Sequence, residues 1–185
     1  MHTYCDMQNA SLEIILTHEY LMMSLHVSLE DVQMFSGKSG EEEARKVFPG
    51  IRAWTQDSQS RLAVWHAGQV FKIARSFEKT KLRDFYAVTL YHSTLTLWVY
   101  GMVTSNTARK SVGQSPARPS TPRTSDLRDR SFSSPPMTLV DGENEKAAKA
   151  FTLLGQGTPG IQSVSSGYIP LSNSCLLYTS PSPRD

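Results

Sequence analysis

The stretch that decides the fold runs from Phe85 to Val103 and reads Phe-Tyr-Ala-Val-Thr-Leu-Tyr-His-Ser-Thr-Leu-Thr-Leu-Trp-Val-Tyr-Gly-Met-Val. It contains no charged residue, and apolar side chains occupy every side of a helical wheel. A helix that is apolar all round is either central in a core or spans a membrane. We interpret Lys81 to Val103 as a buried central helix. Truncating Trp98 to alanine is then expected to cost about 3–5 kcal/mol of folding free energy.

A single membrane span over residues 85–103 is the competing interpretation of this stretch. Its length just reaches the roughly 20 residues that a helical span requires. However, one histidine, one serine and three threonines interrupt the apolar side chains, and basic residues flank both ends without a clear asymmetry. The pattern therefore favours the buried helix, and we expect no contact with a membrane.

Upstream of the central helix, the first helix is expected from Ser11 to His26. Apolar side chains recur there every three or four residues, and Glu19 falls within the same stripe. Ser28 and Asp31 then have the spacing of a helix N-cap, which predicts a short helix through Val32 to Phe35. A Ser-Gly-Lys-Ser-Gly sequence after Phe35 is expected to end it.

Two further helices are predicted between the short helix and the central one. The first begins with three glutamates, of which Glu41 faces Arg45 four residues later, and Pro49-Gly50 is expected to end it. The second covers Gln56 to Phe77. Its apolar side chains lie on more than one side, so we expect this helix to have neighbours on two faces.

Three polar residues fall within apolar surroundings and are the candidate site residues. His66 and Gln69 lie near the middle of the main apolar stripe of the helix Gln56 to Phe77, and His92 lies in the central helix. A buried polar group without a hydrogen-bond partner costs roughly 1–3 kcal/mol. We therefore predict that His66, Gln69 and His92 belong to a buried polar network. Contact of His66 and Gln69 with a ligand, in a helical small-molecule-binding domain, is the alternative.

Residues 104–136 have a different composition, rich in Ser, Thr, Pro and Arg. Such a segment cannot bury enough apolar surface to offset the entropy of ordering, so we expect a disordered linker. Three hydroxyl residues there precede a proline, and phosphorylation at these positions is a hypothesis. They are Ser115, Thr121 and Ser134.

Order is expected to resume at Met137 and to continue through residues 137–174. Glu143 to Leu154 has helical composition, and the glycines between Gly155 and Gly160 are expected to end this helix. These glycines follow a helix and lack the lysine of a phosphate-binding loop, so no phosphate site is predicted. The last eleven residues, 175–185, resemble a translated sequencing adapter, and we expect the natural protein to continue beyond Ser174.

Composition and motifs limit the function classes. The formal net charge of +2 gives no general argument for nucleic-acid or membrane binding. Cys5 and Cys175 are the two cysteines, which form neither a disulfide framework nor a zinc module. The sequence has no His-Glu-x-x-His motif and no Gly-x-Ser-x-Gly motif. We therefore expect no catalytic residue, no metal ligand and no cofactor in this chain, and we do not expect an enzyme.

Three segments carry a resemblance to a known family. They are Ala-Val-Trp-His-Ala-Gly-Gln-Val-Phe-Lys-Ile-Ala-Arg at 63–75, Leu-Arg-Asp-Phe-Tyr-Ala-Val at 82–88, and Tyr-His-Ser-Thr-Leu-Thr-Leu-Trp-Val-Tyr-Gly at 91–101. They resemble the fungal-specific transcription factor domain, the helical middle homology region related to xylanolytic activators. With similar stretches on both sides, the resemblance covers most of residues 11–162. The stretches are 27–32, 35–45, 139–143 and 151–160.

The resemblance implies a truncated part of a nuclear transcription factor. The implied fold is all-α, a helical bundle or array formed by residues 1–103 and 137–174 around a long disordered insert. Zinc is implied only in a separate DNA-binding module, so this chain would meet DNA through that module alone. Transcriptional machinery or regulatory proteins are the implied partners. His66, Gln69 and Trp98 match landmarks of the family, and we expect them to have packing roles.

Overall fold

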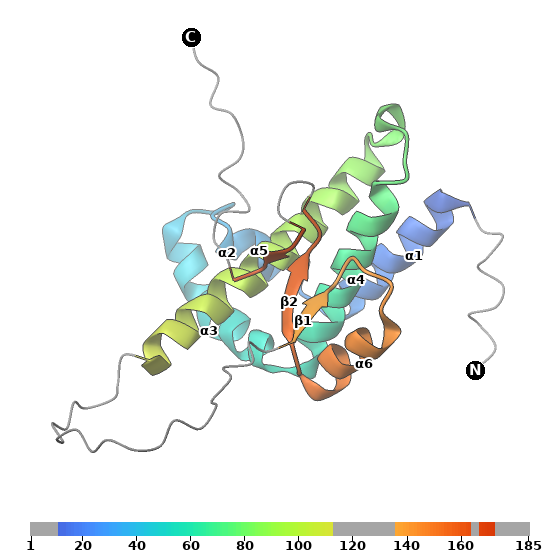
Figure 1. Cartoon of the computed structure of the whole chain (residues 1–185). Coiled ribbons are helices and arrows are strands. Elements are labelled where there is room, and N and C mark those ends of the chain that lie inside the picture. Colours follow the sequence, from blue (N-terminus) through green and yellow to red (C-terminus); the bar gives the residue numbers. More distant parts are fainter. Residues whose placement is uncertain (1–10, 113–135, 164–166, 173–185) are drawn as a thin grey trace, which may run out of the picture.

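The computed structural model describes residues 11–112, 136–163 and 167–172 (Figure 1). The three candidate phosphorylation residues and the adapter-like tail lie outside the described residues. Most of the described chain is helical, as the sequence predicted. The helices are α1 (Leu12–Leu25), α2 (Leu29–Phe35), α3 (Glu41–Gln56), α4 (Ser58–Ala74), α5 (Phe85–Val112) and α6 (Glu145–Leu154), with a short 3-10 turn at Lys79–Lys81.

A small sheet corrects the all-α prediction. It consists of β1 (Met137–Leu139), β2 (Thr158–Ile161) and β3 (Ile169–Pro170), in the order β1-β2-β3. β1 and β2 are parallel, and α6 forms the connection between them, while β3 pairs antiparallel with β2. The sequence prediction missed β2 because its four residues include a proline and a glycine, which are poor strand formers.

Helix α4 lies at the centre of the fold (Figure 1). α1 packs along one side of it, α5 along a second, and α6 with the loop after β1 along a third. The prediction that this helix has neighbours on two faces is thus confirmed. The predicted stripe holds in part, since its members Val70 and Ala74 are buried, but Ala63, Val64 and Ala67 outside it are fully buried as well.

Glycines allow the C-terminal segment to approach α4 and α5 closely. A Cβ atom on Gly68 of α4 would collide with the backbone carbonyl of Val140. A Cβ atom on Gly101 of α5 would collide in the same way with the carbonyl of Leu171. Both contacts are to backbone, which cannot swing aside as a side chain can. The two helices therefore need glycine at these positions.

Helix α5 packs in the core between Thr89 and Val103, but Phe85, Val88 and Tyr91 near its start are exposed, so the predicted burial on all sides holds only in part. Leu97, Val99 and Val103 are buried, whereas Trp98 is only partly buried and packs against the edge of the core. The buried hydroxyls of Thr89 and Ser93 donate to backbone carbonyls one turn earlier, which explains how polar side chains fit in this helix. The helix also continues to Val112, so residues 104–112 correct the predicted start of the linker.

None of the helices in the described part of the chain, α5 included, is long and apolar enough to span a membrane.

The predicted N-cap and helix-surface ion pairs are present. Ser28 Oγ accepts a hydrogen bond from the Asp31 N–H, and Glu41 pairs with Arg45 across one turn of α3. The predicted end of α3 at Pro49-Gly50 is wrong, because the helix continues through both residues to Gln56. Packed residues on each side of the proline support this continuation. They are Phe48, whose ring stacks on Phe35, and Ile51, which is buried.

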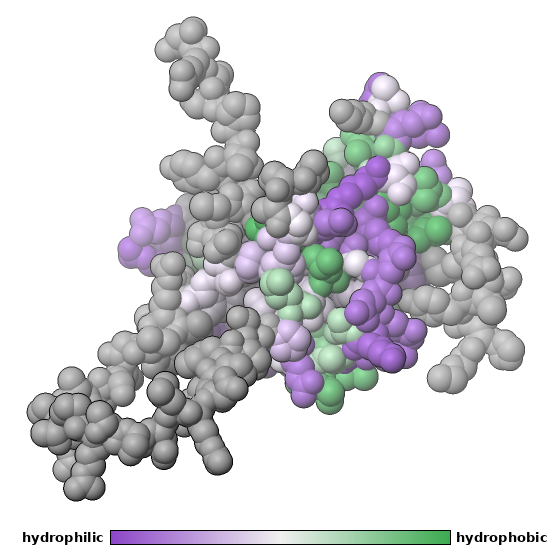
Figure 2. Space-filling model, in the orientation of Figure 1, coloured by the Kyte–Doolittle hydropathy of each residue, from purple (hydrophilic) through white to green (hydrophobic). Residues whose placement is uncertain are grey.

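The segment Met137–Leu139, the connecting loop and α6 form the front surface of Figure 1. Over α6, this face shows hydrophilic and hydrophobic side chains next to one another (Figure 2). The opposite side of α6 contributes Phe151, which is only 1% exposed and packs into the same core as α4 and α5. The C-terminal segment is therefore part of the same packed unit as the N-terminal helices.

Candidate functional site

His66 joins α4 to α1 through a carboxylate. Its Nδ1 lies 2.7 Å from Oε2 of Glu19, and this glutamate is 9% exposed. The His18 Nδ1 lies 3.5 Å from the other oxygen of the same carboxylate. The His26 ring stacks on the His66 ring with centroids 6.1 Å apart, and its Nδ1 lies 2.6 Å from Gln59 Oε1. Glu19 of α1 therefore supplies the hydrogen-bond acceptor for His66, which faces α1 from α4.

His92 is part of a second chain of hydrogen bonds, which crosses from α2 through α5 to α1. Lys38 Nζ donates to Gln33 Oε1 at 2.6 Å, so the amide nitrogen of Gln33 donates to His92 Nε2 at 2.7 Å. The remaining Nδ1–H of His92 then donates to the Tyr20 hydroxyl, 2.8 Å away. Both ring nitrogens of neutral His92 therefore form hydrogen bonds.

The surroundings of His92 oppose its protonation. Burial lowers the pKa of His92 below the ordinary histidine value, and the positive charge of Lys38 lowers it further. Protonation would also place a hydrogen on Nε2, which now accepts from Gln33. The same burial raises the pKa of the Tyr20 hydroxyl, so this group stays neutral as well. These surroundings therefore favour the uncharged forms of both His92 and Tyr20.

Gln69 belongs to a third set of contacts, which fixes the loop after β1 to α4. Its Nε2 donates to the carbonyl of Val140 at 2.8 Å and to that of Gly142 at 3.3 Å. Just after the end of α4, Arg75 pairs with the fully buried carboxylate of Asp141 at 2.6 Å. Asp141 also accepts two hydrogen bonds from the backbone N–H of Gln162, at 3.0 and 2.9 Å.

The three candidate residues therefore lie in three separate sets of hydrogen bonds and not in one network. Each is partly buried and has a partner: His66 faces α1, His92 joins α1 and α2, and Gln69 holds the loop after β1. Among the described residues, every fully buried side-chain nitrogen and oxygen has a hydrogen-bond partner. These contacts hold elements together, which is the packing role expected for His66 and Gln69.

Of these partners, only Glu19 had a signal in the sequence, and Tyr20 and Asp141 had none. Glu19 interrupts the apolar stripe of α1, which signals a carboxylate that faces the core. Tyr20 is an ordinary amphipathic residue at the edge of that stripe. Asp141 precedes a glycine, a pair typical of a turn, and only the folded chain shows that its carboxylate is buried against Arg75.

Shallow hollows occur on the surface. One, of about 390 Å³, lies beside the outer face of α1 and is lined by Ile14, His18, Leu21 and Tyr86, among others. A neighbouring hollow of about 410 Å³ is lined by residues 80–86 and Glu13. Neither His66 nor Gln69 lines these two hollows.

No group of three or more histidine, cysteine, aspartate or glutamate side chains in the described part of the chain is arranged to hold a metal ion. Comparison with known protein families, curated proteins and solved structures gives no match.

Proposed function

We propose that this chain is a regulatory and interaction domain from the middle of a fungal, zinc-dependent transcription factor that acts in the nucleus. The resemblance of residues 63–75 and 91–101 to the fungal-specific transcription factor domain carries the proposal. These residues lie in α4 and α5, two helices that pack together at the centre of the fold. Two separate parts of the resemblance thus belong to one structural unit.

The contacts of the landmark residues support a scaffold role. His66 bonds Glu19 of α1, Gln69 bonds the carbonyl of Val140, and Trp98 packs against the core. A domain of this kind would act by presenting a surface to transcriptional machinery or regulatory proteins. DNA would be bound by a separate zinc module of the same protein.

The test is to tether the full chain to DNA. The chain is fused to the zinc-cluster DNA-binding domain of an unrelated fungal activator, and transcription is measured from a reporter that carries the matching sites. We expect transcription to differ, in either direction, from that given by the DNA-binding domain alone. An unchanged reporter, with the fusion present in the nucleus at an equal amount, would contradict the proposal.

A matched control separates a folded-domain effect from an effect of an exposed peptide. In a fusion that carries Gly68→Leu, the new side chain would collide with the Val140 carbonyl and disrupt the packing of the C-terminal segment on α4. We expect this variant to lose the change in transcription. A variant that keeps the full change would show that the effect comes from an unfolded segment.

A further inference from the structure

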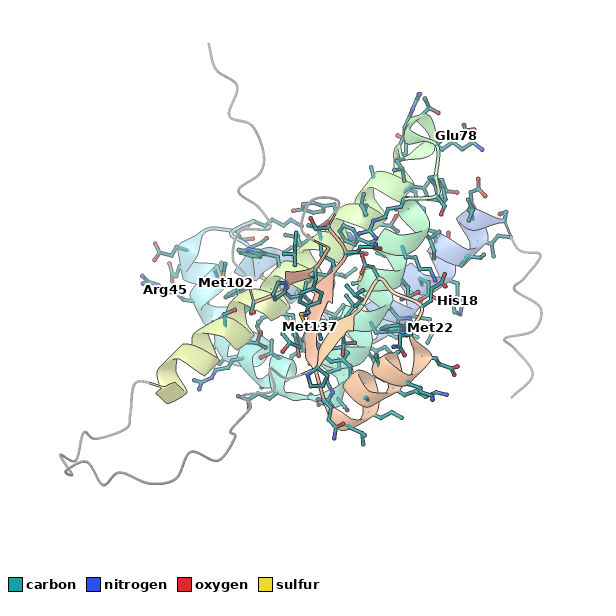
Figure 3. All side chains as sticks on the ribbon, viewed as in Figure 1. His18, Met22, Arg45, Glu78, Met102 and Met137 are labelled. Carbon is teal, nitrogen blue, oxygen red and sulfur yellow. The ribbon has the colours of Figure 1, made fainter. Side chains whose placement is uncertain are left out.

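Helix α1 has two apolar faces, and only one is covered. Leu16 and Met23 on the inner face are 1% and 0% exposed and pack in the core. On the outer face, Ile14, Leu21 and Leu25 are 60%, 57% and 75% exposed. With His18, which Figure 3 shows at the edge of the molecule, these three residues form a stripe at spacings of four, three and four residues. This spacing is that of a helix–helix contact.

The outer stripe of α1, defined as Ile14, His18, Leu21 and Leu25, is complementary to itself. When a second α1 lies antiparallel across it, Ile14 of one copy faces Leu25 of the other, and His18 faces Leu21. The two halves of the stripe are related by a twofold axis that passes between His18 and Leu21. A contact of this type is closed and pairs the same surface from each subunit.

The shape of the surface agrees with this register. Leu25 is the most exposed of the large apolar side chains in the described residues, and it stands at one end of the stripe. Along the rest of the stripe, the hollow of about 390 Å³ is lined by Ile14, His18 and Leu21, by the neighbouring Glu13 and Thr17, and by Tyr86 of α5. Antiparallel pairing places Leu25 of the second copy opposite Ile14, beside this hollow. A protruding side chain on each copy then meets a hollow on the other.

The charges agree as well. No Lys, Arg, Asp or Glu belongs to the stripe, so pairing brings no like charges together. The antiparallel arrangement also sets the N-terminus of each helix beside the C-terminus of its partner, where the helix dipoles attract.

We propose that the outer face of α1 binds the same face of a second copy of this chain, with the two helices antiparallel and Ile14 opposite Leu25. The interface is small, so the dimer is of the weak, reversible class. This inference rests on the shape and charge of α1, and it does not depend on the proposed role in transcription.

Sedimentation analysis of the full chain tests the proposal. Over about 1–200 μM we expect a reversible monomer–dimer equilibrium, and we expect Leu21→Lys to raise the dissociation constant about tenfold or more. Met137→Lys is the matched control, because Met137 is 62% exposed on β1, on the other side of α4 from α1. This control should leave the equilibrium unchanged. Circular dichroism of each variant shows that it remains folded.

Cysteine crosslinking tests the register. In a background in which Cys5 and Cys175 are both replaced by serine, Ile14→Cys protein mixed with Leu25→Cys protein should form a disulfide between two different chains. Ile14→Cys alone should not crosslink, because the two copies of residue 14 lie about 16 Å apart along the paired helices. A chain that stays monomeric throughout the concentration range, for instance because the stripe binds another protein, would overturn the proposal. Equal crosslinking of Ile14→Cys alone would overturn the antiparallel register.

Discussion

At the scale of single residues, buried polar groups decide how the helices meet. Glu19 accepts from His66, His92 connects Tyr20 to Gln33, and Asp141 holds Arg75. Loss of one partner leaves the other buried without a bond, which costs more than the bond itself contributes. The histidines were recognisable in the sequence as polar groups within apolar stripes. Their partners come from other elements, and of these partners only Glu19 had a signal in the sequence.

His92 makes folding sensitive to acid. Its pKa is lowered in the folded protein, so the unfolded chain binds the proton more readily. The stabilisation by neutral His92 is therefore fully present above the unfolded-state pKa of about 6.5 and is lost as the pH falls below it. We expect His92→Gln to reduce the fall in unfolding free energy between about pH 7.5 and 5.5.

Chemical denaturation at a series of pH values measures this difference. His18→Gln is the control, because His18 is exposed and forms only the longer contact with Glu19. The control should keep a pH dependence close to that of the unmodified chain. If His92→Gln also keeps it, His92 is not a source of the acid sensitivity.

The Arg75–Asp141 pair fixes the loop after β1. Arg75→Met would leave the fully buried carboxylate of Asp141 with the backbone N–H of Gln162 as its hydrogen-bond donor among the described residues. Since the arginine is itself partly exposed, we expect a loss of about 1–3 kcal/mol in unfolding free energy. In a double-mutant cycle with Asp141→Asn, the two losses should not add. Additive losses would mean that the two groups act independently.

At the scale of elements, the sequence predicts local structure well and long-range pairing poorly. The helical ranges of α1, α2 and α4 follow from apolar spacing and from the Ser28 cap. Helix α3 continues through Pro49 because of packing against α2, which is a tertiary effect. β2 forms because Gly160 accepts from the N–H of Val140 and the N–H of Thr158 donates to Pro136, about twenty residues away.

Replacing each of two helix glycines by alanine should change the unfolding free energy in opposite directions. In a helix interior, Gly→Ala alone stabilises by about 0.5–1 kcal/mol. Gly50→Ala in α3 meets open space, so we expect this gain. Gly68→Ala in α4 places the Cβ against the Val140 carbonyl, and we expect a net loss in unfolding free energy. Urea denaturation of both variants measures the two effects. A stabilised Gly68→Ala would show that the loop after β1 does not lie on α4.

At the scale of the whole molecule, one core joins the two ends of the described chain. Phe151 of α6 and Leu171 pack in the same cluster as Val64 of α4 and Val99 of α5. The N-terminal helices and the C-terminal segment should therefore unfold together. This shared core could not be predicted from spacing within one segment, because its members lie on both sides of residues 113–135.

Phe151→Ala tests the shared core. Removing this fully buried ring should cost about 3–5 kcal/mol and shift a single unfolding transition. Leu153→Ala, two residues away and 70% exposed, is the control and should change stability by less than about 0.5 kcal/mol. Both are measured by circular dichroism and by tryptophan fluorescence, which reports on the N-terminal helices. If Phe151→Ala separates the two signals into distinct transitions, the segments fold independently.

The most direct test of the proposed function is to sequence the full-length transcript that encodes this chain and to translate both flanks. We predict a zinc-binding cluster of cysteines, or of cysteines and histidines, in the same reading frame. We also predict that native sequence replaces the adapter-like residues 175–185. A complete reading frame without a zinc module, or one with additional apolar spans, would contradict the assignment to a transcription factor.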